Sequence, residues 1–302
     1  MTPPHPDEHA ERPLAALLAP DILALLDEAP GSVPHETEEL HPADLADVAE
    51  AIPADRVIQL LSVLPADRAA EVLEHLNEEL RSTVLEEMTA RQAAALVSQM
   101  NPDDRADALD ELEEERAEEI LAEIPAAERK ETEQLLAYDP DTAGGLMTTQ
   151  FVSVSADTSV EHALALVRHI ARAGRKRAMH AIYVTDSYGR LRGVMSLREL
   201  LAAPEGSLVG DQAWSEVVSV PVTATGEEVA RLTSNYDLVA LPVVDATNRM
   251  AGVITVDDVI DVIKDEATED VYRLAGLTGD DRVFTSAFDS LRKRLPWLLV
   301  NL

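Results

Sequence analysis

Residues 248–259 read NRMAGVITVDDV, and residues 189–200 read GRLRGVMSLREL, so one pattern of turn, strand and helix start occurs twice in the chain. Gly193 and Gly252 lie 59 residues apart, and so do Ser196 and Thr255. Farther upstream, Val154 and Val220 match with an offset of 66, so the first copy holds seven extra residues, which we place in the basic stretch 171–177. The duplication predicts two α/β units, each built as strand, helix, strand, turn, strand and helix.

The helix predicted after the second copy carries four acids spaced 3, 4 and 4 residues apart: Asp258, Asp261, Asp265 and Glu269. This spacing places all four on one side of an α-helix. Carboxylates at i and i+4 repel each other and weaken a helix by a few tenths of a kcal/mol per pair. Lys264 is the only basic residue in this stretch. We therefore expect cations from outside the chain, or Lys264, to compensate these charges.

Acidic residues dominate the whole chain, with 57 Asp and Glu against 25 Lys and Arg and a net charge of -32. Residues 1–150 hold 36 of the acids and 9 of the bases, so the first half is a polyanion. Such a surface repels nucleic acid and concentrates cations, and we expect no nucleic-acid partner. From charge alone, solubility or a salt-adapted proteome explains the same balance.

A short period appears from His41 onward. Helix-start signatures recur 11 to 13 residues apart as far as Pro102, and Pro and acids suit the first turn of a helix. Units this short cannot bury an apolar face alone, so they must stack into an α-superhelix. The expected starts are Pro42, Pro53, Pro65, Glu78, Ala90, Pro102 and Pro125.

Catalytic chemistry has little support in the sequence. The chain has no cysteine, and its eight histidines show no HExxH or other metal-ligand spacing. We find no GxSxG elbow and no phosphate loop, and we do not expect an enzyme.

The C-terminal residues LPWLLVNL follow directly on Arg292, Lys293 and Arg294. Basic residues, an interfacial Trp and an apolar run are typical of the cytoplasmic start of a membrane helix. Eight residues fall short of the roughly 20 that a span requires, so these residues alone favour an ordinary apolar helix end. The first residues lack a signal peptide.

The two copies resemble a tandem pair of cystathionine β-synthase (CBS) domains. The hallmark is Gly, two apolar residues, Ser or Thr, two residues and an acid, at Gly193–Glu199 and Gly252–Asp258. Together with DPDTAGGLMT (139–148), EATEDVYRLAG (266–276) and the acidic helical repeats, the chain from residue 41 to 302 resembles the cytosolic part of MgtE-type magnesium channels and transporters.

This resemblance implies an α plus α/β fold with a connecting "plug" helix leading into a first membrane helix. The implied parts are a Pro/Ala-rich segment 1–40, an acidic superhelical N domain 41–137, a linker 138–150, CBS domains 151–208 and 209–272, and the plug helix with the membrane start at 273–302. It also implies a homodimer through the CBS domains, a multi-pass cell-membrane protein whose present region is cytoplasmic, and a transmembrane pore domain of the same chain that is absent here.

The resemblance further implies Mg²⁺ sites that Glu71, Asp103 and Asp107 supply from the helical domain. Mg²⁺ takes octahedral oxygen ligands and keeps several waters, so one or two carboxylates per site suffice. Asp103 also fits a first-turn acid that complements the helix dipole. Where the family often has an acid, this chain has Thr225. The implied ligands of the second half are Glu227, the Ser234 carbonyl, Asp237, Asp258, Asp261, Glu266, Glu269 and Asp270.

The expected function is a Mg²⁺ sensor that favours the closed pore. Two carboxylates 4 Å apart repel by roughly 4 kcal/mol at an effective dielectric constant of 20. At low Mg²⁺ the acidic helical domain would swing away from the acidic CBS face, and at high Mg²⁺ bridging ions would favour closure.

An adenine-nucleotide sensor is the alternative, since CBS clefts often hold ATP or AMP. Thr255 with Asp258, and less well Ser196, would then contact the ribose, and the basic run 175–177 would approach phosphates. Ala181 and Leu238 stand where ATP-binding relatives tend to have aromatic residues. A purely structural scaffold would leave the acids around Asp258 unexplained.

Overall fold

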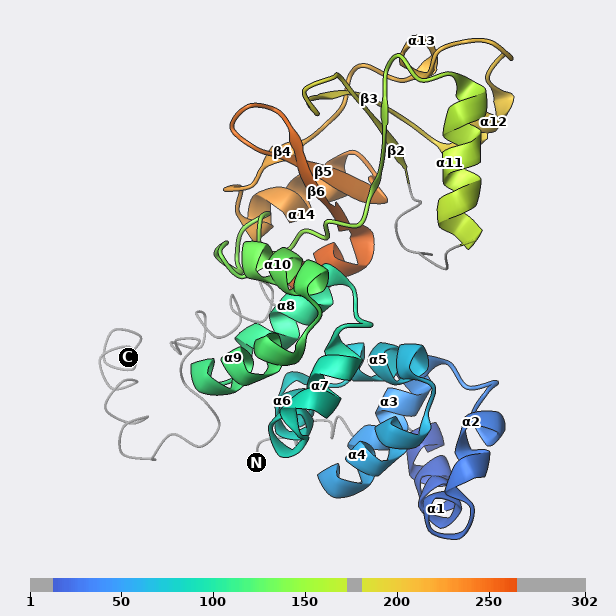
Figure 1. Ribbon diagram of the computed structural model, residues 1–302, viewed down its shortest axis with the longest axis vertical. Coiled ribbons are helices and arrows are strands. Elements are labelled where there is room, and N and C mark those ends of the chain that lie inside the picture. The colour runs from blue at the N-terminus through green and yellow to red at the C-terminus, as the bar shows by residue number, and fades with distance from the viewer. Residues whose placement is uncertain (1–12, 173–180, 265–302) are drawn as a thin grey trace, which may run out of the picture. The chain divides into compact units, whose positions relative to one another are not determined.

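The computed structural model describes residues 13–172 and 181–264. The chain divides into two compact units, Met1–Tyr138 and Asp139–Leu302 (Figure 1). The predicted plug helix and membrane start, at 273–302, lie outside the described residues. Among the helices that the structure does describe, none has the length and apolar character needed to cross a bilayer.

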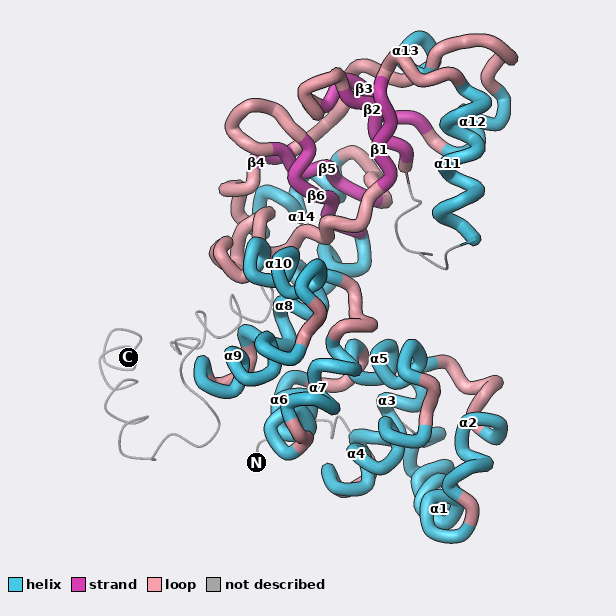
Figure 2. Tube along the Cα trace, in the orientation of Figure 1, coloured by secondary structure: helices cyan, strands magenta, loops and turns pink. Residues whose placement is uncertain are grey.

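The first unit is helical throughout its described part, whereas strands occur in the second unit (Figure 2). The expected α plus α/β architecture is confirmed. The helices of the first unit are α1 (Pro13–Glu28), η2 (Pro30–Ser32), α2 (Val33–Glu36), α3 (Pro42–Glu50), α4 (Ala54–Val63), α5 (Ala66–Glu74), α6 (Glu78–Glu87), α7 (Ala90–Val97), α8 (Pro102–Asp110), α9 (Glu114–Glu123) and α10 (Ala126–Leu135).

The helix starts follow the predicted period, with one addition. The sequence predicted no start between Pro102 and Pro125, but α9 begins at Glu114. Pro42 and Pro102 occupy the first turn of their helices, as expected. Pro53 is instead the N-cap of its helix, with an extended backbone (ψ 148°). A proline is compatible with this place because the N-cap N–H takes no part in the intrahelical ladder.

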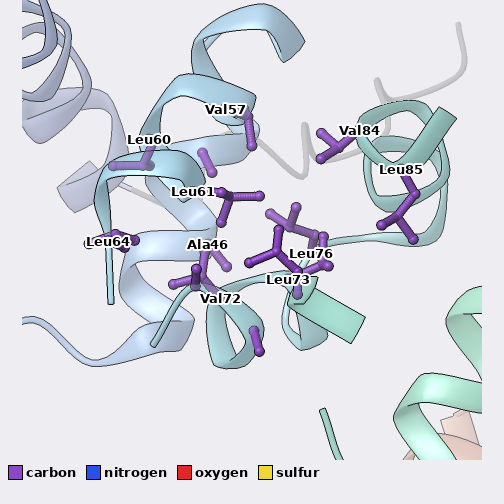
Figure 3. Close-up of a cluster of buried hydrophobic side chains, with 14 of the residues drawn as sticks. Ala46, Val57, Leu60, Leu61, Leu64, Val72, Leu73, Leu76, Val84 and Leu85 are labelled. Atoms are coloured by element: carbon purple, nitrogen blue, oxygen red, sulfur yellow. The ribbon is translucent and has the colours of Figure 1, made fainter. Parts of the chain in front are cut away.

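One apolar core runs through the first unit from Ala15 to Ile124. Leu61 from α4, Leu73 from α5 and Val84 from α6 are almost completely buried and approach one another in its interior (Figure 3). Helices α1 and α2, which precede residue 41, contribute to the same core. Each short helix thus buries its apolar side only by stacking on its neighbours, as the repeat pattern requires.

The second unit contains the two predicted copies, each with a three-stranded sheet in which the first strand pair is parallel and the second antiparallel. The predicted order of strands and helices is confirmed. The elements are β1 (Val152–Ser155), α11 (Val160–Arg172), β2 (Ile182–Thr185), β3 (Leu191–Met195), α12 (Leu197–Ala202) and α13 (Val209–Gln212), then β4 (Val220–Pro221), α14 (Gly226–Asn235), β5 (Ala240–Val244), β6 (Met250–Thr255) and helical residues 256–264.

The segment before each copy pairs, through one residue, with a strand in the sheet of the other copy. Thr148, ahead of the first copy, exchanges two backbone hydrogen bonds with Val253 in the second sheet (2.8 and 3.0 Å). Trp214, ahead of the second copy, does the same with Val194 in the first sheet (both 2.9 Å). This exchange joins the two copies into one unit.

The hallmark glycines make this close approach feasible. A Cβ at Gly252 would lie 2.6 Å from the Thr148 carbonyl oxygen, and one at Gly193 would lie 2.9 Å from the Trp214 carbonyl oxygen. Any larger residue would force the paired backbone apart. The glycine of the duplicated motif is therefore required by the fold, whatever ligand the motif binds.

Candidate metal-binding surfaces

Helix α8 of the first unit carries both predicted ligands of that helix on one side. Asp103 is buried in its first turn, and Asp107 is exposed one turn later. Glu111, the C-cap, follows after a further turn and continues the same side. We call Asp103, Asp107 and Glu111 the α8 acidic face. The position of Asp103 in the first turn also suits the helix dipole, so its presence alone does not establish a metal site.

Arg81 of α6 neutralises the C-terminal end of this face. Its Nε donates to Glu111 Oε2 (2.8 Å), its Nη2 donates to Glu111 Oε1, and its Nη1 donates to the Glu74 carbonyl (3.3 Å). Burial by itself lowers the pKa of Arg81. The hydrogen bond from Arg81 to Glu111 and the negative charges of Glu111, Asp107 and Asp104 outweigh this effect and raise the pKa above its ordinary value.

Glu71, the third predicted ligand of the first unit, lies exposed on α5, one turn before Glu74. Glu74 Oε1 accepts a hydrogen bond from the backbone N–H of Asn101, the N-cap of α8 (3.2 Å). The end of α5 therefore meets the start of α8. In ranges 13–172 and 181–264, however, no three Asp, Glu or His side chains are grouped closely enough to hold a metal. The acids form open surfaces instead of a closed cage.

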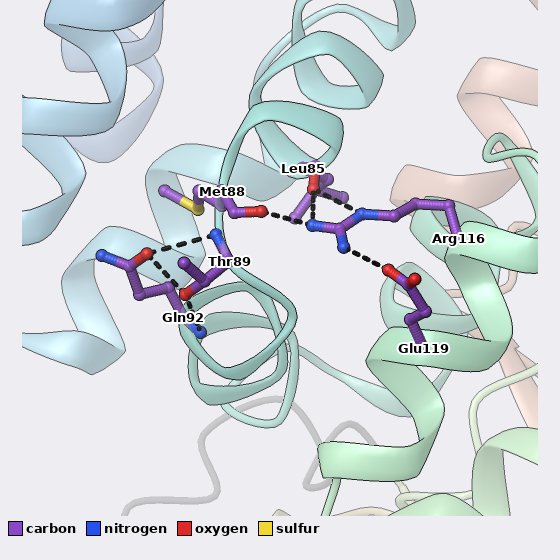
Figure 4. A network of polar contacts seen from close by, with 6 residues as sticks. All are labelled: Leu85, Met88, Thr89, Gln92, Arg116 and Glu119. Atoms are coloured by element: carbon purple, nitrogen blue, oxygen red, sulfur yellow. Dashed lines mark hydrogen bonds and ion pairs between the residues drawn. The ribbon is translucent and has the colours of Figure 1, made fainter.

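Most arginines of the first unit are committed to contacts within it. Arg116 donates to the carbonyls of Leu85 (2.8 Å) and Met88 and pairs with Glu119 (2.8 Å), as Figure 4 shows. These contacts satisfy carbonyls at the end of an earlier helix. The arginines with such internal contacts are Arg56, Arg68, Arg81, Arg105, Arg116 and Arg129. Few basic groups remain to offset the exposed acids, so the surface favours cations.

In the second unit, Asp258 and Asp261 lie on one side of helical residues 256–264. Asp258 Oδ2 accepts hydrogen bonds from the Thr255 hydroxyl (2.6 Å) and backbone N–H (3.3 Å), so it helps to cap the helix. Asp261 pairs with Lys264 (2.7 Å), the compensation that the sequence suggested. Both partners are about two thirds exposed, and such surface pairs contribute little.

The ligands predicted around α14 lie at its opposite ends. Glu227 is in the first turn, Ser234 is in the last turn, and Asp237 follows in the left-handed region (φ 48°). A helix of 10 residues is about 15 Å long, so Glu227 and Asp237 cannot bind one ion. Thr225, where the family often has an acid, caps α14 by accepting the Glu228 N–H (3.3 Å). Glu266, Glu269 and Asp270 lie outside the described residues.

In the first hallmark motif, the acid Glu199 is held by hydrogen bonds within the protein. Glu199 Oε2 accepts hydrogen bonds from the Ser196 N–H (2.7 Å) and hydroxyl (3.0 Å), and Oε1 accepts one from the exposed indole N–H of Trp214 (2.6 Å). The Ser196 N–H and then the Trp214 indole are the main causes that hold the pKa of Glu199 below its usual range. Both carboxylate oxygens of Glu199 thus have partners inside the protein.

Two residues of these surfaces, Glu111 and Trp214, were not predicted from the sequence. Glu111 continues the four-residue spacing of Asp103 and Asp107, so extending that pattern by one turn would have found it. Trp214 follows Thr148 with the same offset of 66 that relates the starts of the two copies. The pairing of Arg81 with Glu111 joins residues 30 apart and had no signal in the sequence.

Comparisons with known proteins agree with this architecture. Residues 40–141 match the MgtE intracellular N domain, and residues 143–206 and 209–265 match the CBS domain. The curated relatives include the magnesium transporter MgtE of Thermus thermophilus (41% identical over 57% of this chain) and that of Enterococcus faecalis (38% over 58%). The chain spans 38% of the length of each. These relatives are transporters and not enzymes.

Two solved structures cover most of the chain. One is the soluble part of a magnesium transporter, with a TM-score of 0.76, 29% identity and coverage of 84% of this chain and 99% of the other. The second is the cytosolic domain of the Mg²⁺ channel MgtE in complex with ATP, with a TM-score of 0.71, 35% identity and coverage of 82% and 98%. The chain therefore belongs to the MgtE family of magnesium transporters and contains the N domain and the tandem CBS domains of that family.

Proposed function

We propose that this chain is the Mg²⁺-sensing, gating part of a magnesium channel or transporter of the cell membrane, with the present region in the cytoplasm. The observation that carries the proposal is the pair of acidic surfaces, the α8 acidic face and the side of residues 256–264 that bears Asp258 and Asp261. Membership of the MgtE family supports it, because the relatives are magnesium transporters.

Mg²⁺ acts as a concentration-dependent counterion in this proposal. Ions shared by carboxylates of the N domain, the CBS pair and the plug helix favour a closed pore, since these surfaces repel one another when the ions leave. A shift of a population from 1:99 to 99:1 requires about 5.5 kcal/mol of differential binding. Several weak ions per chain supply this more readily than one strong ion, which fits open surfaces that lack a closed cage.

Isothermal titration of Mg²⁺ into the whole chain tests the proposal. The variant Asp103→Asn with Asp107→Asn removes two charges from the α8 acidic face and should weaken or abolish part of the measured binding. The matched control, Asp21→Asn with Glu28→Gln, removes two exposed charges from α1 and should bind as the wild type does. An equal loss of Mg²⁺ binding in both variants would show that Mg²⁺ binds diffusely, as a counterion. Absence of Mg²⁺ binding by the wild type would contradict the proposal of a Mg²⁺ sensor.

Adenine-nucleotide sensing is the second candidate, because one relative of known structure binds ATP. Thr255 and Asp258 form a hydroxyl and carboxylate pair of the kind that can contact a ribose. In the other copy, Ser196 and Trp214 both donate hydrogen bonds to Glu199, which fits the poorer match of that motif to a ribose site. We expect Thr255→Ala to weaken ATP binding more than Ser196→Ala does. Titration with ATP measures the affinities. If both variants bind ATP as tightly as the wild type does, the nucleotide site is not the one assigned to the second copy.

A homodimer through the CBS domains is part of the proposal. Equivalent helices of the two copies expose apolar side chains at matching places, Leu197 and Leu201 on α12 and Val256 and Ile260 in residues 256–264. Such a repeated apolar surface fits a second copy of the chain. Sedimentation equilibrium should give a dimer for the wild type and a monomer for Leu201→Glu with Ile260→Glu. A monomeric wild type would contradict this part.

A further inference from the structure

Arg81 lies where three helices with acidic side chains approach one another. It belongs to α6, its Nη1 donates to a carbonyl at the end of α5, and its guanidinium forms two hydrogen bonds with Glu111 at the end of α8. The side chains of Arg81 and Glu111 are only 15% and 13% exposed. This ion pair is therefore largely withdrawn from water and is less screened by salt than the surface pairs of the chain.

Several acids of α8 act on Arg81. Asp104 and Asp107 act electrostatically on it in addition to Glu111. Glu71 lies one turn before Glu74 on α5, and Asp103 lies one turn before Asp107 on α8. The arginine of α8 itself, Arg105, is turned to α10, where it binds Thr132 (2.7 Å) and Glu131 (3.0 Å). Arg81 thus supplies a positive charge of the protein to the C-terminal end of the α8 acidic face.

We propose that Arg81 is a built-in counter-cation that sets how weakly the α8 acidic face binds divalent ions. This inference rests on the proposed function and adds its regulation. A fixed positive charge near Asp107 lowers the negative potential that attracts Mg²⁺, while the pairing with Glu111 keeps the guanidinium in place. The face then binds ions weakly, which a sensor requires if it is to release them when their concentration falls.

The test compares variants that differ in one charge. Arg81→Gln removes the counter-cation and should raise the Mg²⁺ affinity of the whole chain about three- to tenfold, as expected for one unit charge acting across a partly screened surface. Arg81→Lys keeps the charge and should stay within about twofold of the wild type. Arg56→Gln removes an arginine with a similar structural role, bonded to Leu23 and Asp27, and should leave the affinity unchanged.

The single variant Arg81→Gln leaves the largely buried carboxylate of Glu111 without its arginine. A second pair of variants removes this carboxylate and so avoids the problem. Glu111→Gln alone and Glu111→Gln with Arg81→Gln differ only in the charge of Arg81, and we expect the same three- to tenfold difference between them. Circular dichroism and the melting temperature show whether each variant folds. This second pair measures the effect of the Arg81 charge even where the single Arg81→Gln chain fails to fold.

The outcomes separate the inference from the proposed function. Binding of Mg²⁺ by the wild type with equal affinity in Arg81→Gln would overturn the role of Arg81 and leave the sensor intact. An equal gain in Arg56→Gln would show a general charge effect and would also overturn the role of Arg81. No Mg²⁺ binding in any variant would overturn both. Tighter binding in Arg81→Gln alone supports both.

Discussion

At the scale of single residues, Glu199 shows how one acid of a duplicated motif can serve the fold. Its oxygens accept hydrogen bonds from Ser196 and Trp214, and it lies at the start of α12 as part of a capping box. Such a box satisfies backbone N–H groups that otherwise have no partner at the helix N-terminus. In the second copy, Asp258 makes the equivalent contact with Thr255. The shared Ser/Thr and acid therefore have a structural role independent of any ligand.

This role predicts a pH dependence of stability. Because the pKa of Glu199 is lowered in the folded chain, its contribution is fully present above the ordinary pKa of a glutamate and is lost as the pH falls through the lower, folded value. The melting temperatures of wild type and Glu199→Gln should differ by a constant amount at neutral pH and converge in acid. Glu205→Gln, which removes an exposed acid of the same copy, is the control for the loss of one negative charge. A constant difference down to strongly acidic pH would contradict the assignment.

At the scale of elements, the helical repeat was predictable because its signals are local. Pro, acids and helix-capping residues recur near each start, and apolar residues follow at helical spacing. Helix α9 was missed because its start, with Glu113 as the N-cap and Glu114 as the first helical residue, carries no proline, although it continues the period. The exchange of Thr148 and Trp214 between the two sheets was not predictable, since it depends on contacts more than 100 residues apart for Thr148 and Val253.

The exchange predicts that Gly252 tolerates no side chain. In Gly252→Ala, the new methyl group would meet the Thr148 carbonyl and the Met147 sulfur at 2.6 and 2.7 Å. The backbone of the segment before the first copy, which contains both residues, must therefore shift. We expect a loss of about 1–3 kcal/mol in the free energy of unfolding, the usual cost of overpacking. Chemical denaturation measures it.

Gly31→Ala is the matched control, because a Cβ there meets nothing within 4 Å. Its stability should change by less than about 0.5 kcal/mol. Equal stability of Gly252→Ala and Gly31→Ala would show that the segment with Met147 and Thr148 does not pack against β6 in solution.

At the scale of the whole molecule, the sequence predicted the division into a helical part and a duplicated α/β part, because each has its own period. It predicted where acids concentrate, but the contacts that modulate them depend on tertiary structure. Arg81 reaches Glu111 from another helix, and Thr225 caps α14 at a place where the resemblance suggested an acid. The metal ligands themselves stay a prediction, and Glu266, Glu269 and Asp270 lie outside the described residues.

Small-angle X-ray scattering of the chain, first in EDTA and then across millimolar Mg²⁺, tests the sensor most directly. KCl keeps the ionic strength fixed, which separates specific bridging by divalent ions from general screening. We expect a smaller radius of gyration with Mg²⁺ but not with K⁺ alone, and no such change when Asp258, Asp261 and Glu269 are neutralised together. A radius that does not respond to Mg²⁺, or an equal response to K⁺, would contradict the Mg²⁺ sensor.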